Sequence, residues 1–363
     1  MRGEVDPQSS MFHYFSVESR IPADHPLRRV KKLAESALSA ISAELDGLYA
    51  RTGRPSIPPE RLLKAQLLIA FYSVRSDRLF CEQLDYNLLF RWFLDLDLES
   101  GGLDQSNFSR LRERLVETDI ARRFFDEVVR LARKDKLLSS DHFTVDGTLI
   151  DAWASFKSFK RKDDDEPPKP GDGTGMVDFK GEKRSNATHQ STTDPDAKLM
   201  RKGNGQPAKL SYGGHALMEN RSGLCVDLLI TDATLAEHQA ARQLLTRARR
   251  RKIHPKTLGA DKGYHVKDFV QHLREHGIKP HIARIDGRKT PGLDGRTSCT
   301  EGYKVSQRKR KRIEEIFGWL KTVGGMRKTR FIGEARTQIA AYLSAAAYNL
   351  LRIAKFQAAG SAA

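Results

Sequence analysis

The chain has 363 residues, enough for one large domain or two ordinary ones, and its Lys and Arg exceed its Asp and Glu by 17. This excess favours a polyanionic partner, because a cation placed on a phosphate releases a condensed counterion. It does not distinguish DNA from RNA or from an anionic membrane. No run approaches the roughly 18 apolar residues of a membrane span, and the N-terminus lacks a signal-peptide pattern. The chain has three cysteines, Cys81, Cys225 and Cys299, and they are too widely spaced for a disulfide framework or a zinc site. We therefore expect a reduced, cytoplasmic protein.

Residues 1–136 are expected to form an all-helical, DNA-binding domain. Pro58 and Pro59 mark the start of one helix, and residues 79–94 carry apolar side chains at three-to-four spacing. Capping side chains around Asp104 precede another helix. A further helix turns Phe124, Phe125, Val128, Val129 and Leu131 inward. Exposed arginines on short helices suit DNA binding, although a helical bundle with a merely solvated charged face explains them as well.

Residues 137–356 change character and predict a catalytic domain of mixed α/β type, followed by a tail over residues 357–363. The expected strands are 142–150, 209–218, 224–231, 257–261 and 279–283. The expected helices are 235–250, 266–276, one that starts near Arg308, and 337–355. Residues 160–205, rich in charge, Pro and Gly, are interpreted as a flexible insertion. Three strands followed by alternating helices and strands predict a ribonuclease-H-like mixed sheet with helices on both faces.

Two aspartates fall where ligands collect in such a sheet, at or near strand ends. Asp146 lies in the first strand just before a glycine, and Asp261 ends a later strand. Asp151 competes with Asp146. Being five residues apart on one strand, the two side chains point to opposite faces, so at most one of them enters a given site. Each aspartate alone is compatible with an ordinary turn or cap.

The third carboxylate comes from the helix that carries residues 310–321. At about 100° per residue, four apolar residues share an arc that faces the sheet: Ile313, Ile316, Phe317 and Leu320. Arg310, Glu314 and Lys321 form a strip beside that arc. Glu315 points the other way, into solvent. An i,i+4 Arg–Glu pair on an amphipathic helix would explain part of this pattern, but not its position beside the buried arc.

Together these segments resemble the DDE transposases of bacterial insertion elements, most closely the insertion-sequence-five group. The similarity lies in residues 145–148, residues 260–264 and the helix around Glu314, and it extends to residues 193–197, 210–215 and 347–350. Residues 53–59 with the helix that follows are similar to the helical DNA-binding domain of the family. Nearly the whole chain is covered.

The resemblance implies that Asp146, Asp261 and Glu314 are the catalytic ligands of two Mg²⁺ ions, with Mn²⁺ as an expected substitute. Arg310 and Lys321 match a Tyr–Arg–Glu–Lys signature of related transposases and would contact DNA phosphates, whereas Gln307 occupies the tyrosine position. The partners implied are double-stranded DNA, both terminal inverted repeats and target, and other copies of the chain, in a homodimer or larger assembly on bacterial nucleoid DNA. No membrane is involved.

Three other functions remain open at this point. One is a DNA-binding protein derived from a transposase without catalysis, which would have no need of three carboxylates among so much positive charge. Another is a ribonuclease-H-like nuclease that cuts without strand transfer. The third is a basic RNA-binding protein, for which the helical part lacks an aromatic-rich strand that stacks bases.

Overall fold

The computed structural model describes residues 16–47, 56–162, 184–203 and 205–360. The N-terminal part is helical, as predicted, with α1 (Val17–Arg20), α2 (Leu27–Ala40), α3 (Ser42–Asp46), α4 (Pro59–Phe71), α5 (Asp77–Tyr86), α6 (Leu88–Phe93), α7 (Gln105–Arg114) and α8 (Ile120–Lys134). The Asp104 carboxylate caps α7 by accepting the Asn107 N–H at 2.8 Å. Residues 79–94 are two helices rather than one, because Asn87 ends α5 and its side chain caps α6.

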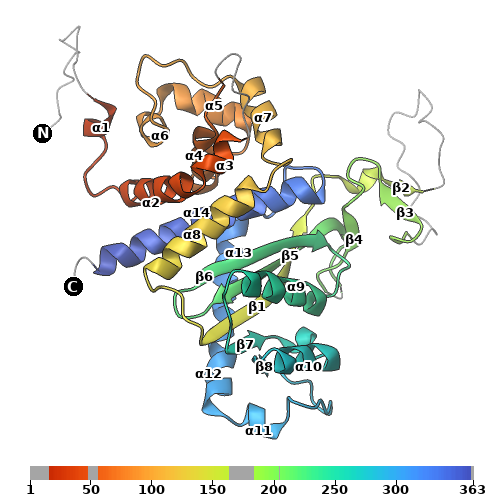
Figure 1. Cartoon of the computed structure of the whole chain (residues 1–363). Coiled ribbons are helices and arrows are strands. Elements are labelled where there is room, and N and C mark those ends of the chain that lie inside the picture. Colours follow the sequence, from red (N-terminus) through yellow and green to blue (C-terminus); the bar gives the residue numbers. More distant parts are fainter. Residues whose placement is uncertain (1–15, 48–55, 163–183, 204, 361–363) are drawn as a thin grey trace, which may run out of the picture.

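The sheet follows the predicted ribonuclease-H-like order. Its main strands are β1 (His142–Asp151), β5 (Lys209–Glu219), β6 (Leu224–Asp232), β7 (Thr257–Ala260) and β8 (Lys279–Ile282). β5 pairs antiparallel with β1 and with β6, whereas β7 is parallel to β1 and β8 is parallel to β7. Helices α9 (Glu237–Arg250) and α10 (Lys267–Glu275) cover one face. The other face is covered by α12 (Glu301–Lys309), α13 (Ile313–Thr322) and α14 (Glu334–Gly360), as Figure 1 shows.

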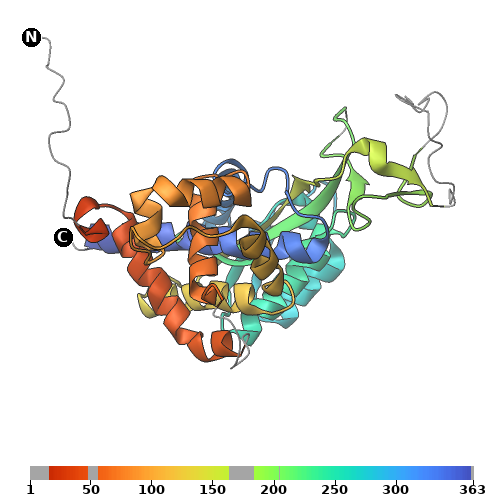
Figure 2. The ribbon, with the colours of Figure 1, turned by 90° about the horizontal axis from the view of Figure 1, so that it is seen from above.

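The segment interpreted as a flexible insertion is partly ordered by the sheet. Residues 163–183 lie outside the described residues. The rest contains β2 (Phe159–Arg161), β3 (His189–Ser191) and β4 (Lys198–Met200), with β2 and β3 forming a ribbon that projects from the body (Figure 2). β4 pairs with the start of β5, and the buried Asp194 accepts a 2.6 Å hydrogen bond from the Tyr212 hydroxyl. Strand pairing, hydrogen bonds and a few buried apolar side chains, among them Ala197, order these residues, so the low hydropathy of the segment predicted a loop.

Helix α14 joins the helical region to the sheet. It is buried on all sides along its middle, from Ala341 to Leu350, and it packs against α2, α4 and α8 as well as β6 (Figures 1 and 2). One hydrophobic core therefore runs through both parts of the chain, although helices give way to strands between the end of α8 at Lys134 and the start of β1 at His142. Neither α14 nor any other described helix is both long and apolar enough to cross a membrane.

Candidate active site

Asp146 lies in the middle of β1, partly buried, and its Oδ1 accepts the Gly147 N–H at 2.8 Å. The pKa of the Asp146 carboxyl is raised to about 6, mainly by burial and in part by the charges of Asp261 and Glu314, while the Gly147 N–H and Arg310 act to lower it. These mutual influences show that the fold brings all three predicted carboxylates together. They come from segments as far as 168 residues apart (146 to 314).

Asp261 is held beside Asp146 by the strand register. β7 pairs parallel with β1 so that Gly259 is level with Thr144, and two residues further on Asp261 comes level with Asp146. The strand ends at Ala260, and the Asp261 side chain caps the turn that follows by accepting the Gly263 N–H at 2.8 Å. The parallel pairing therefore puts two carboxylates side by side on neighbouring strands.

Glu314 approaches from α13, which differs from the single helix expected from near Arg308. The chain forms α12, then a 3-10 turn over Arg310–Arg312, then α13, so Glu314 sits in the first turn of a new helix with its side chain exposed. The apolar arc behaves as predicted: Ile313, Ile316, Phe317 and Leu320 are buried. A continuous helical wheel holds from Ile313 onward but not for Arg310, since the 3-10 turn has a different pitch.

Glu315 differs from the expectation of a free, solvated side chain. Its carboxylate lies 3.0 Å from Arg352 of α14 and 3.4 Å from Arg312, with half of the side chain exposed. Glu314 and Glu315 therefore point to different surroundings, one toward the carboxylate cluster and one toward arginines on α14 and the 3-10 turn.

Of the two predicted cations, Arg310 acts on the charge of Asp146, whereas the carboxylate that acts on Lys321 is that of Asp151. Lys321 donates a 2.6 Å hydrogen bond to the Thr148 hydroxyl, and burial lowers the pKa of its ammonium. Thr148 shares a face of β1 with Asp146, because alternate strand residues point the same way. Arg310 acts on the Asp146 charge, and its Nε donates to the Gln307 side chain at 3.0 Å. The glutamine at the tyrosine position thus positions this arginine.

Asp151, the competitor of Asp146, is the last residue of β1 and forms a 2.7 Å ion pair with Lys209. Its carboxylate is already compensated by this lysine, and it does not appear among the charges that act on Asp146. The structure brings Asp146, and not Asp151, to Asp261 and Glu314.

A fourth carboxylate, Glu237, was missed by the sequence analysis. It is the first residue of α9, and its pKa is raised to about 7, mainly by burial and in part by the charges of Asp261 and Asp146. An acidic residue in the first turn of a helix is an ordinary preference that the helix dipole explains. Nothing in the local sequence therefore marks Glu237 as part of a site.

These residues fit a hard divalent cation. All four side chains offer oxygen ligands, which Mg²⁺ prefers. Within the described residues, none of the four carboxylates pairs with a lysine or arginine. Nearby, the buried Tyr264 hydroxyl and His215 Nδ1 have no hydrogen-bond partner in this part of the chain. A cation with its water ligands would offset the clustered negative charge and supply partners for such atoms.

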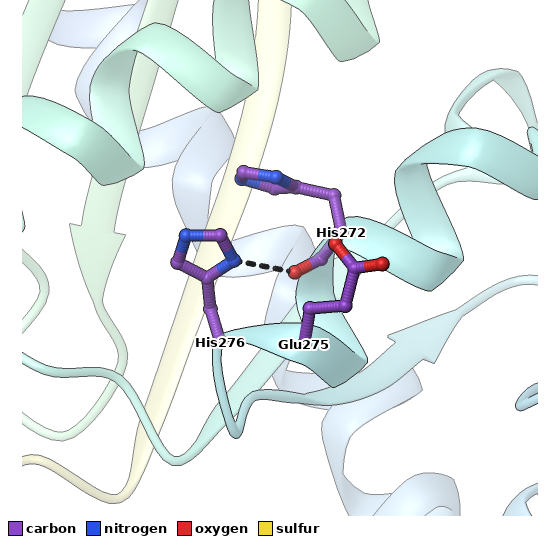
Figure 3. Close-up of side chains that lie close together, drawn as sticks. All are labelled: His272, Glu275 and His276. Carbon is purple, nitrogen blue, oxygen red and sulfur yellow. Dashed lines mark hydrogen bonds between the residues drawn. The ribbon is translucent and has the colours of Figure 1, made fainter.

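A second group of possible ligands lies elsewhere. His272, Glu275 and His276 on the last turn of α10 form the one set in the described ranges whose ligand atoms all lie within 4.8 Å of one another (Figure 3). The carboxylates of the active site are therefore more widely spread. Because α10 connects the parallel strands β7 and β8, its C-terminal end lies at the edge of the sheet opposite to Asp261. The histidine group is thus separate from the carboxylate cluster.

Clustered carboxylates flanked by cations, on a mixed sheet of this order, define the class of metal-dependent enzymes that process phosphodiesters. Two family models match the sequence, a transposase domain (DUF772) over residues 15–114 and a transposase DDE domain over residues 179–350. The chain is a DDE transposase, an enzyme that acts on DNA. Asp261 and Glu314 fall within the DDE match, and Asp146 precedes it.

No curated protein matches the chain in sequence. Among solved structures, a piggyBac transposase synaptic complex with hairpin DNA is similar at 11% identity and a TM-score of 0.44, covering 93% of this chain and 76% of that one. A Mos1 transposase paired-end complex matches at 10% identity and a TM-score of 0.21, covering 76% and 81%. A Mos1 strand transfer complex matches at 13% identity and a TM-score of 0.20, covering 78% of this chain and 82% of that one.

Proposed function

We propose that this transposase binds the terminal inverted repeats of an insertion element, cuts the DNA at its ends and transfers the cut strands to target DNA. Asp146, Asp261 and Glu314 would hold two Mg²⁺ ions, for which Mn²⁺ can substitute. The observation that carries the proposal is the approach of these three carboxylates from β1, the end of β7 and α13. Burial is the main cause that raises the pKa of Asp146 to about 6, and the charges of Asp261 and Glu314 contribute to it.

The chemistry assigned to each residue follows from its position. Divalent ions bound to the three carboxylates would activate water and then the 3′-hydroxyl of the element, and stabilise the leaving oxygen. Arg310 lowers the pKa of Asp146 and so favours its ionised, ligating form. Arg310 and Lys321 would bind the phosphates of the strand being cut, the arginine as a two-pronged donor and the lysine as a point charge.

Neighbouring glutamates test this assignment. Glu314→Gln keeps the size of the side chain but removes the charge, so cleavage of a DNA carrying the element's ends should fall by orders of magnitude while end binding survives. Glu315→Gln is the matched control. It loses part of an exposed ion pair with Arg352, so stability should change by about 0.5 kcal/mol or less and cleavage should persist. Full cleavage by Glu314→Gln protein would refute the triad.

The same assay separates the phosphate contacts from the metal ligands. Lys321→Ala should reduce strand-transfer products strongly while the Mg²⁺ concentration that gives maximal cleavage stays unchanged, since an ammonium cannot ligate a cation. A shifted Mg²⁺ optimum would contradict the phosphate role. Cleaved ends without any strand-transfer product in the wild type would identify a nuclease instead.

Recognition of the element ends is assigned to the helical region within residues 1–136, with two or more copies of the chain assembled on the nucleoid DNA of a bacterial cytoplasm. The exposed Arg78 on α5 and Arg110 on α7 offer cations for this contact. In the full chain, Arg78→Ala with Arg110→Ala should weaken binding to the terminal repeat and flatten its salt dependence. Arg250→Ala, an exposed arginine of α9, is the control. Equal losses in both proteins would contradict the assignment.

A further inference from the structure

We infer that Glu237 is a fourth carboxylate ligand of the divalent-metal site, reaching it from the face of the sheet opposite to Glu314. The inference rests on the proposed function, because it concerns the ions that Asp146, Asp261 and Glu314 would hold. It adds a ligand from α9, an element that the three-carboxylate assignment does not use.

Two glycines make room for the Glu237 carboxylate. A Cβ placed on Gly147 would lie 2.9 Å from one Glu237 oxygen, Oε1, and a Cβ placed on Gly263 would lie 3.2 Å from the other, Oε2. Gly147 follows Asp146, and Gly263 lies in the turn that starts at Asp261 and donates its N–H to the Asp261 carboxylate. The carboxylate therefore lies between the backbone segments that carry the two aspartates, in space that any larger residue at Gly147 would take.

The alternating directions of the β1 side chains explain how Glu237 and Glu314 approach the site from different sides. Successive residues of a strand point to opposite faces, so Asp146 and the space above Gly147 face opposite ways. Thr148, on the Asp146 face, contacts Lys321 of α13, whereas Gly147 meets Glu237 of α9. The two glutamates thus approach the paired aspartates from the two sides of β1 and β7.

The surroundings of Glu237 suit a cation and not a structural ion pair. No lysine, arginine or hydrogen-bond donor pairs with its carboxylate among the described residues, although the charges of Asp261 and Asp146 act on it. Two buried polar atoms beside it, His215 Nδ1 and the Tyr264 hydroxyl, lack partners in the same part of the chain. His215 Nδ1 lies 3.1 Å from the same Gly147 Cβ position that Glu237 approaches. A cation with bound water would satisfy this group as a whole.

Metal binding by the full, EDTA-treated chain tests the inference without measuring activity. Mn²⁺ is titrated into protein carrying His272→Ala and His276→Ala, which removes the other candidate ligand group, and free Mn²⁺ is followed by its electron paramagnetic resonance signal. In this background, Glu237→Gln should weaken Mn²⁺ binding at least about tenfold. Glu334→Gln is the matched control, because Glu334 is also a partly buried glutamate at the start of a helix, and it should bind Mn²⁺ normally.

Two further variants, Gly147→Ala and Asp146→Asn, separate a failure of this inference from a failure of the proposed metal site. Gly147→Ala keeps every charge but pushes the Glu237 carboxylate away, so it should weaken Mn²⁺ binding in the same direction. Asp146→Asn should abolish binding if the proposed metal site is right. Weak binding by Asp146→Asn with normal binding by both Glu237→Gln and Gly147→Ala would overturn the inference alone. Normal binding by Asp146→Asn would overturn the proposed metal site itself, and the inference with it.

Discussion

Acidic side chains of the same sheet occur in two settings: around Asp227 they are paired with arginine, and in the active site they are not. Asp227 of β6 is almost fully buried, and its oxygens accept hydrogen bonds from the Leu228 N–H at 2.9 Å and from Arg251 at 2.8 Å. Arg251, which follows α9, also pairs with Asp126 of α8 at 2.6 Å. Charges that compensate one another therefore link α8, β6 and the end of α9. In the active site, the charges of Asp261 and Glu314 act on Asp146, and those of Asp261 and Asp146 act on Glu237, while none of the four carboxylates has a paired cation in the described chain.

The difference separates a structural network from a functional one. A buried charge with matched partners is tolerated in a fold, and removing one partner exposes the full cost of burying the other. A cluster of like charges that no side chain compensates destabilises the metal-free protein. Such clusters persist where function requires them, because a bound cation supplies the missing charge.

The largest expected effect is on catalysis and comes from Asp146→Asn. Cleavage and strand transfer should fall by orders of magnitude, because a ligand charge is lost. The free energy of unfolding without metal should stay equal or rise, because repulsion with Asp261 and Glu314 is relieved. Asp151→Asn, which removes the ion pair with Lys209 and a charge that acts on Lys321 but no ligand of the proposed metal site, should retain activity. Urea unfolding and an end-cleavage assay measure both quantities, and a destabilised Asp146→Asn protein would break the comparison.

The compensated network should show the reverse pattern with Asp227→Asn. Arg251 would keep its charge but lose a buried partner, so the protein should lose about 3 kcal/mol of unfolding free energy. Cleavage by the fraction that remains folded should be unaffected. Asp141→Asn, on a well-exposed pair with Lys256, serves as the control and should leave stability unchanged. The midpoints of urea unfolding at neutral pH decide between these outcomes.

A smaller effect is expected from pH in the absence of metal. The pKa values of Glu237 and Asp146 are raised in the folded protein, to about 7 and about 6. Carboxyls in an unfolded chain titrate near pH ~4. Between these values the folded protein keeps protons that the unfolded chain releases, so the stabilising contribution of these groups is lost as pH rises from about 4 to 7.

Comparison with Glu237→Gln isolates this contribution from that of other titrating groups. Wild-type protein in EDTA should lose more unfolding free energy across this pH range than the variant does, and saturating Mg²⁺ should reduce the difference. Parallel pH profiles for the two proteins would show that Glu237 is compensated in the fold after all.

Much of the secondary structure could be predicted from local sequence patterns. Repeating apolar spacing and turn residues predicted the helices and the main strands, and three strands followed by alternating elements predicted the sheet order. The misses have identifiable causes. Asn87 broke a helix that apolar spacing suggested was continuous, and pairing with β5 ordered β4, a strand of three residues within a segment dominated by polar residues.

What the sequence by itself determined is the local structure, the sheet order and the segments that carry Asp146, Asp261 and Glu314, because these depend on periodicity, on neighbouring residues and on motifs. Only the tertiary structure decided which charges meet. Glu315 pairs with Arg352, and Glu237 reaches Asp146 and Asp261 across two glycines. Such contacts depend on strand register and on helix packing between distant segments, and electrostatic interaction follows distance in space rather than separation along the chain.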